Sequence, residues 1–369
     1  MKKIYLSLIV LFGMSSVMMA QTDQPAAVTA PQTDQPVVPA FKPSGKPIVT
    51  IFSDFTNVNY NGKSNNAFEI SRAYFGYGYN FSSDFSGKVL FDVANSATVT
   101  VTDPNKTGVT AALPSAYSAF LKNAYGEYSH GLVKVDVGLI GENMFDLQES
   151  VWGKRYLYKS FQDQYSFGSS ADLGAKVKLQ FIPEVSFDFE ILNGEGYKKV
   201  QADSTFQFAA GLTVQPIKNL FARVYYDYTA NQSYATTKVA QSSFNVFVGY
   251  KSDGGSIGAE FNTQNGNKFV KGGNWSGYSI YGTLPVINKL SVFARIDALS
   301  SDKIGTATTS WNSGKSGSDG QVYIAGVEFV PVKGIQISPN FKYADPSAAV
   351  ITAGGHATST INVNLGINF

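Results

Sequence analysis

The side chains that could carry chemistry in this chain are charged groups rather than nucleophiles or metal ligands. The 369 residues include no cysteine and two histidines. His130 falls in a predicted tight turn and His356 in a predicted loop near the opposite rim, so neither can readily orient a nucleophile in a serine triad. The lack of cysteine excludes disulfides and thiolate metal sites, and a histidine metal site needs imidazoles within reach of each other. We therefore expect no catalytic residue, no metal and no cofactor.

Residues 141–168 form the segment best suited to a functional role. A long segment without strand-like alternation is usually functional or disordered, and its aromatic content argues against disorder. Its charged residues are Glu142, Asp146, Glu149, Lys154, Arg155, Lys159 and Asp163, and its aromatic residues include Phe145, Trp152, Tyr156, Tyr158 and Phe161. Two arrangements are open: an inward fold, with the aromatics packed on a wall and the charges facing each other across a passage, or an external lid with solvated charges. We favour the inward fold.

Charges outside this segment recur on one face of strand-like runs, opposite the aliphatic residues. The basic members are Arg72, Lys88, Lys134, Lys176, Lys178, Arg223, Arg295 and Lys342. The acidic members are Asp92, Asp136, Asp188, Glu190, Asp227, Glu260, Asp297 and Glu328. Three pairs share a face of one run: Lys88–Asp92, Arg223–Asp227 and Arg295–Asp297. We expect such pairs to neutralise each other, and the alternative is a local basic track through Arg72, Lys176 and Lys178.

The elements that would position these charges are strands, most clearly the last one. Ile361, Val363, Leu365, Ile367 and Phe369 fall on one face, and polar residues and glycine fall on the other. This period of two predicts a strand. A soluble protein rarely leaves such an apolar edge exposed, whereas a transmembrane barrel uses it as the closing strand, with the aliphatic face toward lipid.

The rest of the chain supplies the other strands of a barrel. About 16 strand-like runs follow Ile48, joined alternately by short turns and longer polar loops, which is typical of outer-membrane barrels. Charged residues are 15% of the chain, against about 25% in soluble domains, and no internal stretch approaches the ~18 apolar residues of a spanning helix. The alternative, a soluble sandwich, would need an unusual number of strands. We predict an all-β, antiparallel transmembrane barrel over residues 48–369, with short periplasmic turns and long extracellular loops.

Two N-terminal segments precede the predicted barrel. Residues 1–20 have the lysines, the apolar centre and the small final residue of a secretory signal peptide. Residues 21–47 are rich in Pro, Gln and Thr and are expected to form an extended periplasmic arm. Removal of the signal peptide leaves equal numbers of basic and acidic residues, so no overall field would attract nucleic acid.

Three stretches, in order, resemble the phosphate-selective porins O and P of Gram-negative outer membranes. The first comprises the strand-like runs 68–76 (FEISRAYFG) and 85–92 (FSGKVLFD). The second comprises 121–128 (LKNAYGEY) and 133–141 (VKVDVGLIG), and the third is the following segment with Glu149-Ser150 and 155–161 (RYLYKSF). The resemblance implies a 16-stranded trimeric porin with its third loop folded into the lumen. Phosphate selectivity in that family rests on many lumen arginines, and this chain offers four, Arg72, Arg155, Arg223 and Arg295.

We therefore expect a non-enzymatic outer-membrane porin for passive diffusion of small polar or anionic solutes through a water-filled lumen. A substrate-specific channel for phosphate or sugar and a structural or adhesive barrel with a closed lumen are the alternatives. The predicted pore-lining and constriction residues are Arg72, Lys88, Lys134, Glu142, Asp146, Lys154, Arg155, Lys159, Lys176, Lys178, Arg223 and Arg295. The expected partners are membrane lipid, the solutes, two further copies of the chain in a homotrimer, and the barrel-assembly machinery, which would recognise the strand ending at Phe369. No nucleic-acid partner is expected.

Overall fold

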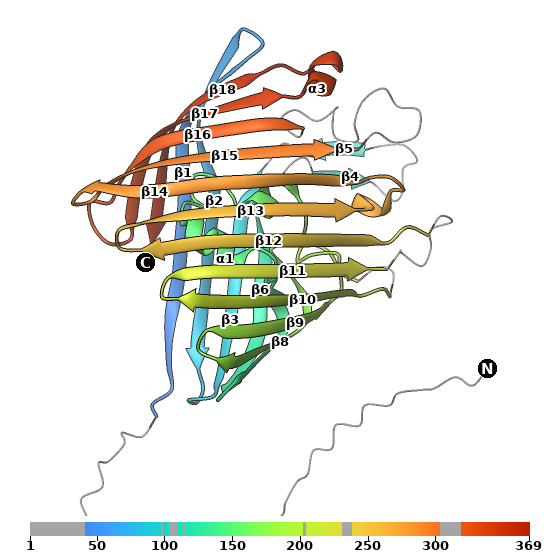
Figure 1. Ribbon diagram of the computed structural model, residues 1–369, viewed down its shortest axis with the longest axis vertical. Coiled ribbons are helices and arrows are strands. Elements are labelled where there is room, and N and C mark those ends of the chain that lie inside the picture. Colours follow the sequence, from blue (N-terminus) through green and yellow to red (C-terminus); the bar gives the residue numbers. More distant parts are fainter. Residues whose placement is uncertain are drawn as a thin grey trace, which may run out of the picture. The chain divides into compact units, whose positions relative to one another are not determined.

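A computed structural model describes residues 41–96, 99–102, 110–113, 116–201, 204–230, 238–302 and 319–369 (Figure 1). The predicted signal peptide, 1–20, and residues 21–40 of the predicted arm lie outside the described residues. Side chains of residues 95–116 are likewise not described.

Sixteen antiparallel strands close into a barrel, which confirms the predicted fold. They are β1 (Ser44–Tyr60), β2 (Lys63–Asn80), β3 (Phe85–Ser96), β6 (Ala116–His130), β7 (Val133–Gly141), β8 (Ala171–Ile182), β9 (Val185–Leu192), β10 (Gln207–Ile217), β11 (Leu220–Thr229), β12 (Gln241–Ser252), β13 (Gly255–Asn265), β14 (Trp275–Ile287), β15 (Leu290–Ser301), β16 (Gly320–Phe329), β17 (Ile335–Pro346) and β18 (Thr358–Asn368). Each pairs with its neighbours in this order, and a separate hairpin of β4 (Val99–Thr102) and β5 (Thr110–Leu113) lies between β3 and β6 in the chain.

The barrel closes where the last strand pairs with the first. β18 runs antiparallel to β1 with Thr50 opposite Asn368, and the backbone groups of Val49 and Phe369 exchange two hydrogen bonds of 3.1 Å. Closure removes the free strand edges that would otherwise pair with another chain. β1 begins at Ser44, so residues 44–47, assigned above to the arm, belong to the wall of the barrel.

Turns and loops separate onto two rims, with one exception to the predicted asymmetry. The turn rim carries the short connections, such as Pro183-Glu184 between β8 and β9, and the loop rim carries the long ones, such as residues 142–170 between β7 and β8. The exception is the β1–β2 connection, which reaches the loop rim but consists of Asn61 and Gly62 alone. Both residues have positive φ, 48° and 73°, the backbone that a two-residue hairpin turn requires and that Asn-Gly adopts readily.

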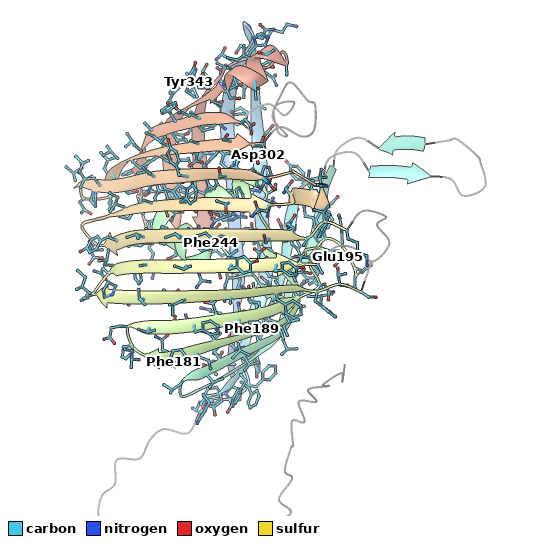
Figure 2. All side chains as sticks on the ribbon, turned by 45° about the vertical axis from the view of Figure 1, so that its right-hand side comes forward. Phe181, Phe189, Glu195, Phe244, Asp302 and Tyr343 are labelled. Carbon is cyan, nitrogen blue, oxygen red and sulfur yellow. The ribbon has the colours of Figure 1, made fainter. Side chains whose placement is uncertain are left out.

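The two faces of the wall differ as the alternation predicted. Apolar side chains such as Ile361 and Val363 are 56% and 43% exposed on the outside, and Phe189, Phe244 and Tyr343 mark this outer face in Figure 2. Charged side chains point inward. A lysine or arginine facing lipid at mid-depth would cost about 2–4 kcal/mol, so this arrangement suits a wall that meets hydrocarbon on one side.

The packed interior of the molecule lies inside the barrel rather than within the wall. It is built around α1 (Asp146–Trp152) and α2 (Phe161–Tyr165) of the 142–170 connection. Two further helical turns in the described part of the chain are η1 (Asn267–Phe269) and α3 (Ala348–Thr352), both in loop-rim connections. Among the described residues, no helix combines the length and apolar character needed to cross a membrane.

Candidate pore constriction

The connection between β7 and β8, called here the inner loop (residues 142–170), folds into the barrel. Its first and last parts bring Met144, Phe145, Phe161, Tyr165 and Phe167 into one buried cluster with side chains of β10, β11, β14 and β15. The ring of Phe167 stacks on that of Trp275 with centroids 5.2 Å apart. Burial of these aromatic rings stabilises the position of the loop inside the barrel.

The middle of the inner loop packs on the same side of the lumen. Val151 and Trp152, at the end of α1, are 1% exposed and contact lumen-facing residues of β12, β14, β15 and β16. The Trp152 ring also lies 5.2 Å from the guanidinium carbon of Arg295. The hydroxyl of Tyr281 donates a hydrogen bond of 2.8 Å to the backbone oxygen of Gln148. The half of the barrel formed by β10–β16 is therefore filled.

After α1, the inner loop crosses to the opposite wall. Gly153 ends the helix in the left-handed conformation, with φ of 66°, which glycine adopts without steric cost. Tyr156 then packs against Phe52 of β1 in a cluster that includes β2 and β3 residues. The carboxylate of Glu328 on β16 accepts hydrogen bonds of 2.8 Å from both Lys154 and Tyr156. The loop is thus fixed to both sides of the lumen.

Charged side chains of the wall pair mostly between strands, which corrects two of the three predicted pairs. Arg295 does bind Asp297, at 2.8 Å. Arg223 instead binds Asp188 of β9, at 2.6 Å, and the partner of Asp92 is Arg72 of β2, at 2.8 Å. Residues four apart on a strand are separated by about 13 Å, whereas facing residues on neighbouring strands have Cβ atoms about 5 Å apart. The predicted Lys88–Asp92 and Arg223–Asp227 pairs were therefore too widely spaced to form.

The Arg223–Asp188 pair depends on a glycine in the strand between them. The guanidinium passes over Gly211 of β10, where an added Cβ would clash with the Nη2 atom of Arg223. Arg223 also donates to Thr213 Oγ1 at 2.9 Å and to the backbone oxygen of Asn143 at 3.1 Å. The ion pair consequently helps to fix the start of the inner loop to the wall.

Three cavities, formed by described residues, lie beside the inner loop along the other half of the barrel. The turn-side cavity, of about 780 Å³, is lined mainly by β3, β6, β7, β8 and the inner loop. The central cavity, of about 300 Å³, shares Phe52, Arg155 and Tyr156 with it. The loop-side cavity, of about 460 Å³, is lined largely by β1, β2, β17 and β18, and shares Asp54 and Lys342 with the central one. The three cavities follow one another from the loop rim to the turn rim.

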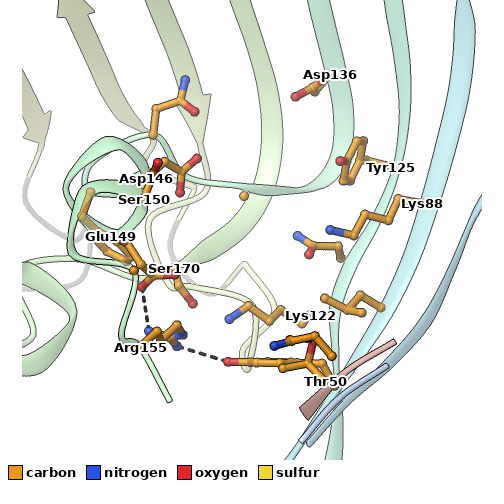
Figure 3. A pocket seen from close by; sticks show the side chains of 18 of the residues that line it. Thr50, Lys88, Lys122, Tyr125, Asp136, Asp146, Glu149, Ser150, Arg155 and Ser170 are labelled. Atoms are coloured by element: carbon orange, nitrogen blue, oxygen red, sulfur yellow. Dashed lines mark hydrogen bonds and ion pairs between the residues drawn. The ribbon is translucent and has the colours of Figure 1, made fainter. Parts of the chain in front are cut away.

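The turn-side cavity has a basic wall and faces acidic residues of the inner loop (Figure 3). Lys88, Lys122 and Lys178 line it, and none of them has a carboxylate within ion-pair distance among the described residues. Asp146 of the loop lies across from Lys88 and is likewise without an ion-pair partner in the described part of the chain. The arrangement opposes charges of different sign across a water-accessible space.

Arg155 marks the boundary between the turn-side and central cavities. Its guanidinium donates to Glu149 at 2.9 Å, to Asp163 at 2.5 Å and to the hydroxyl of Tyr74 at 3.2 Å. Although burial acts in the opposite direction, the charges of Arg155 and Lys159 lower the pKa of Asp163 to about 2. This network keeps the Arg155 side chain in place at the boundary.

Solved structures of outer-membrane channels share this architecture. No protein-family model and no curated protein matches this sequence. OmpF of Salmonella typhi in complex with daunomycin superposes with a TM-score of 0.63 at 10% identity, over 88% of this chain and 97% of that chain. The outer-membrane channel DcaP of Acinetobacter baumannii superposes with a TM-score of 0.60 at 14% identity, over 89% of this chain and 99% of that chain. An anion-selective porin from Comamonas acidovorans superposes with a TM-score of 0.60 at 8% identity, over 89% of this chain and 100% of that chain.

The chain has the fold of an outer-membrane porin. Together with the apolar outer face, the porin fold locates the barrel in an outer membrane. The finer resemblance to phosphate-selective porins remains a prediction.

Eight of the twelve residues predicted to line the pore border the three cavities of this barrel. They are Lys88, Lys134, Asp146, Lys176 and Lys178 at the turn-side cavity, Arg155 at the turn-side and central cavities, and Arg72 and Lys159 at the central cavity. The other four, Glu142, Lys154, Arg223 and Arg295, do not line these cavities. Glu142 and Lys154 are buried within the inner loop, Arg223 and Arg295 are buried beneath it, and each is at most 4% exposed.

Glu142 occupies a buried acidic setting at the start of the inner loop. It is 1% exposed, and its Oε2 atom has no hydrogen-bond partner among the described residues. Burial raises the pKa of the Glu142 carboxyl well above its ordinary value, and the charges of Glu190, Asp172 and Asp227 raise it further. Glu142 therefore holds its proton to a higher pH than an exposed glutamate would.

Lys122 and Tyr197 are among the lumen residues that the sequence analysis missed. Lys122 faces inward because an irregularity in the β3–β6 pairing makes it an extra residue between Leu121 and Asn123, which breaks the alternation used to assign faces. Tyr197 comes from the connection of residues 193–206, and its hydroxyl donates to Asp92 at 2.6 Å. An aromatic residue in a polar loop was the available signal for Tyr197, while the irregularity at Lys122 leaves no mark in the sequence.

Proposed function

We propose that this protein is a passive diffusion channel that admits small polar solutes and weakly prefers anions, rather than an enzyme. The observation that carries the proposal is the series of cavities beside the inner loop. Adjacent cavities share lining residues, namely Arg155 and Tyr156 on one side and Lys342 on the other. A barrel filled by its loop would offer no such series from rim to rim.

The proposed route follows from the two rims. With the short turns on the periplasmic side, as is usual for outer-membrane barrels, solutes enter the loop-side cavity, pass Arg155 and Tyr156, and leave through the turn-side cavity. The smallest of the three spaces is the central one, of about 300 Å³. We assign the constriction to this place, where the inner loop meets β1 and β2.

The anion preference is argued from charges that have no partner. Lys88, Lys122 and Lys178 contribute three unpaired positive charges to the turn-side cavity, and Asp146 contributes one unpaired negative charge. Paired charges largely cancel at a distance, so the unpaired ones set the potential that a passing ion meets. Their balance is +2 in the turn-side cavity. In the other two cavities Asp54, Glu69 and Lys342 have no ion-pair partner in the described part of the chain and add −1, so the balance along the route stays positive at +1.

The experiment that tests the proposal is single-channel recording of the purified protein in a planar bilayer, with a potassium chloride gradient. Stable current steps with a reversal potential displaced moderately toward that of chloride support a weakly anion-preferring channel. A large displacement together with block by millimolar phosphate would favour a phosphate-specific channel instead. An absence of steps would refute diffusion and leave a closed barrel.

The remaining expected partners are proposals of the same kind. Phe369 is 74% exposed at the end of β18, which suits recognition of this strand by barrel-assembly machinery. A homotrimer is expected from the resemblance alone. Mass measurement of the protein extracted in mild detergent tests the trimer, and Phe369→Ser with quantification of inserted protein tests the recognition.

A further inference from the structure

We propose that the turn-side cavity contains a binding site for organic anions that carry a flat ring, such as aryl carboxylates, centred on Tyr125. The inference rests on the proposed function, because the site lies in the water-filled part of the lumen. It adds a preference among anions that charge alone does not give.

Tyr125 presents its ring to the cavity from the lumen face of β6 (Figure 3). It pairs in register with Lys88 of β3 on one side and with Gly138 of β7 on the other. Gly138 has a φ of 127°, and an added Cβ would lie 3.2 Å from the Cβ of Tyr125. The glycine therefore leaves the wall beside the tyrosine without a side chain, and the ring is half-buried rather than covered.

The other aromatic rings of the cavity are already engaged. Phe145 and Phe52 are 3% and 8% exposed, and each is packed in a buried cluster that includes inner-loop residues. Tyr156 donates its hydroxyl to Glu328, and Tyr74 carries the ammonium of Lys122 at 4.9 Å from its ring and accepts from Arg155. The hydroxyl of Tyr125 makes no hydrogen bond to any described residue. Tyr125 is thus the ring of this cavity that remains open to a solute.

Two ammonium groups complete the site. Lys88 and Lys122 both line the cavity with Tyr125, and both lack a carboxylate partner in the described part of the chain. An ammonium binds a carboxylate through charge-assisted hydrogen bonds, and a tyrosine ring binds a flat ring by offset stacking or edge contact. One solute satisfies both groups when its carboxylate is attached to a ring.

The cavity is large enough for passage as well as binding. Its volume of about 780 Å³ lies within the range of roughly 300–1,000 Å³ that holds drug-sized molecules. A small aryl carboxylate would leave room for water, so the site slows the solute without closing the route. Binding of this kind appears as partial, saturable block of the chloride current.

Benzoate is the probe, with acetate and cyclohexanecarboxylate as anions of equal charge that lack a flat ring. In single-channel recordings, benzoate should block at a concentration several-fold below that of either control anion. Tyr125→Leu should raise the benzoate concentration for half-block by about fivefold, since an aromatic pair contributes about 1 kcal/mol. It should leave the acetate concentration for half-block unchanged. Lys88→Gln should weaken block by all three anions.

Tyr128→Leu is the matched control, because Tyr128 lies on the same strand and is partly exposed on its outer face. Equal block by benzoate and cyclohexanecarboxylate, or equal effects of Tyr125→Leu and Tyr128→Leu, would overturn the site and leave the channel intact. Calorimetric titration of the detergent-solubilised barrel with benzoate separates the two proposals. Tyr125-dependent binding without current refutes diffusion alone, and current without Tyr125-dependent binding refutes the site alone.

Discussion

Neutralising the three unpaired lysines of the turn-side cavity should reverse the ion preference of the pore. Lys88, Lys122 and Lys178 have no ion-pair partner in the described part of the chain, and Asp146 faces them unpaired. Their net charge is therefore +2. The triple substitution to glutamine changes this net charge to −1 while leaving the paired charges in place.

The size of the effect follows from Coulomb's law. At roughly 7 Å in water, one unit charge changes the energy of a monovalent ion by about 0.6 kcal/mol, and ~0.1 M salt halves this to about 0.3 kcal/mol. A net charge of +2 then favours an anion over a cation by roughly 1.2 kcal/mol, about an eightfold permeability ratio. Each lysine removed lowers the ratio about threefold, so the triple variant should prefer cations by about threefold.

The assay is the zero-current potential across a tenfold potassium chloride gradient, measured for single-channel insertions. Asp146→Asn should move the ratio in the other direction, to roughly 20 in favour of chloride by the same reasoning. Lys333→Gln is the control, because this exposed lysine lies in the β16–β17 turn, outside the three cavities. A triple variant that stays anion-selective would refute the assignment of selectivity to these lysines.

Three further predictions concern the attachment of the inner loop. Trp152→Ala should cost about 3–5 kcal/mol of loop packing and raise the single-channel conductance, and an unchanged conductance would contradict the role of Trp152 as an anchor. Arg295→Met should destabilise the barrel by about 3–5 kcal/mol in urea unfolding because Asp297 is left buried without a counter-charge, and adding Asp297→Leu should restore much of the loss. The raised pKa of Glu142 means that its contribution to stability is greatest below its ordinary pKa of 4.5 and is lost as pH rises toward its folded-state value. As pH rises above 4.5, the urea midpoint of Glu142→Gln should therefore fall less steeply than that of the unchanged protein. Parallel plots of urea midpoint against pH for the two proteins would refute the raised pKa of Glu142.

The sequence predicted the wall of this barrel well because the wall is governed by a local rule. Alternation along a strand is set by neighbouring residues and by the two media they meet, so the inward direction of Arg295 and the outward direction of Ile296 follow from parity. The same rule fails at Lys122, where the pairing with β3 shifts by one residue. The expected alternation of short turns and longer loops is broken once, at Asn61-Gly62, a dipeptide that is itself a hairpin signal.

The partners of the charges could not be predicted, because they depend on register between strands and on the path of the inner loop. Asp188 and Arg223 are 35 residues apart in the chain and meet across a glycine in another strand. The aromatic content of the inner loop indicated that it would be packed, but the rings it meets come from strands far along the sequence. Such contacts become visible only once the barrel has closed.

The one-sided position of the inner loop gives the circumference of the barrel two different environments. Strands β10–β16 have lipid outside and packed aromatic side chains inside, so little water reaches their backbone from either face. Strands β3 and β6–β8 have water in the turn-side cavity against their inner face. Amide hydrogens of the first arc should accordingly exchange with solvent deuterium far more slowly, and transient separation of neighbouring strands should begin in the second arc.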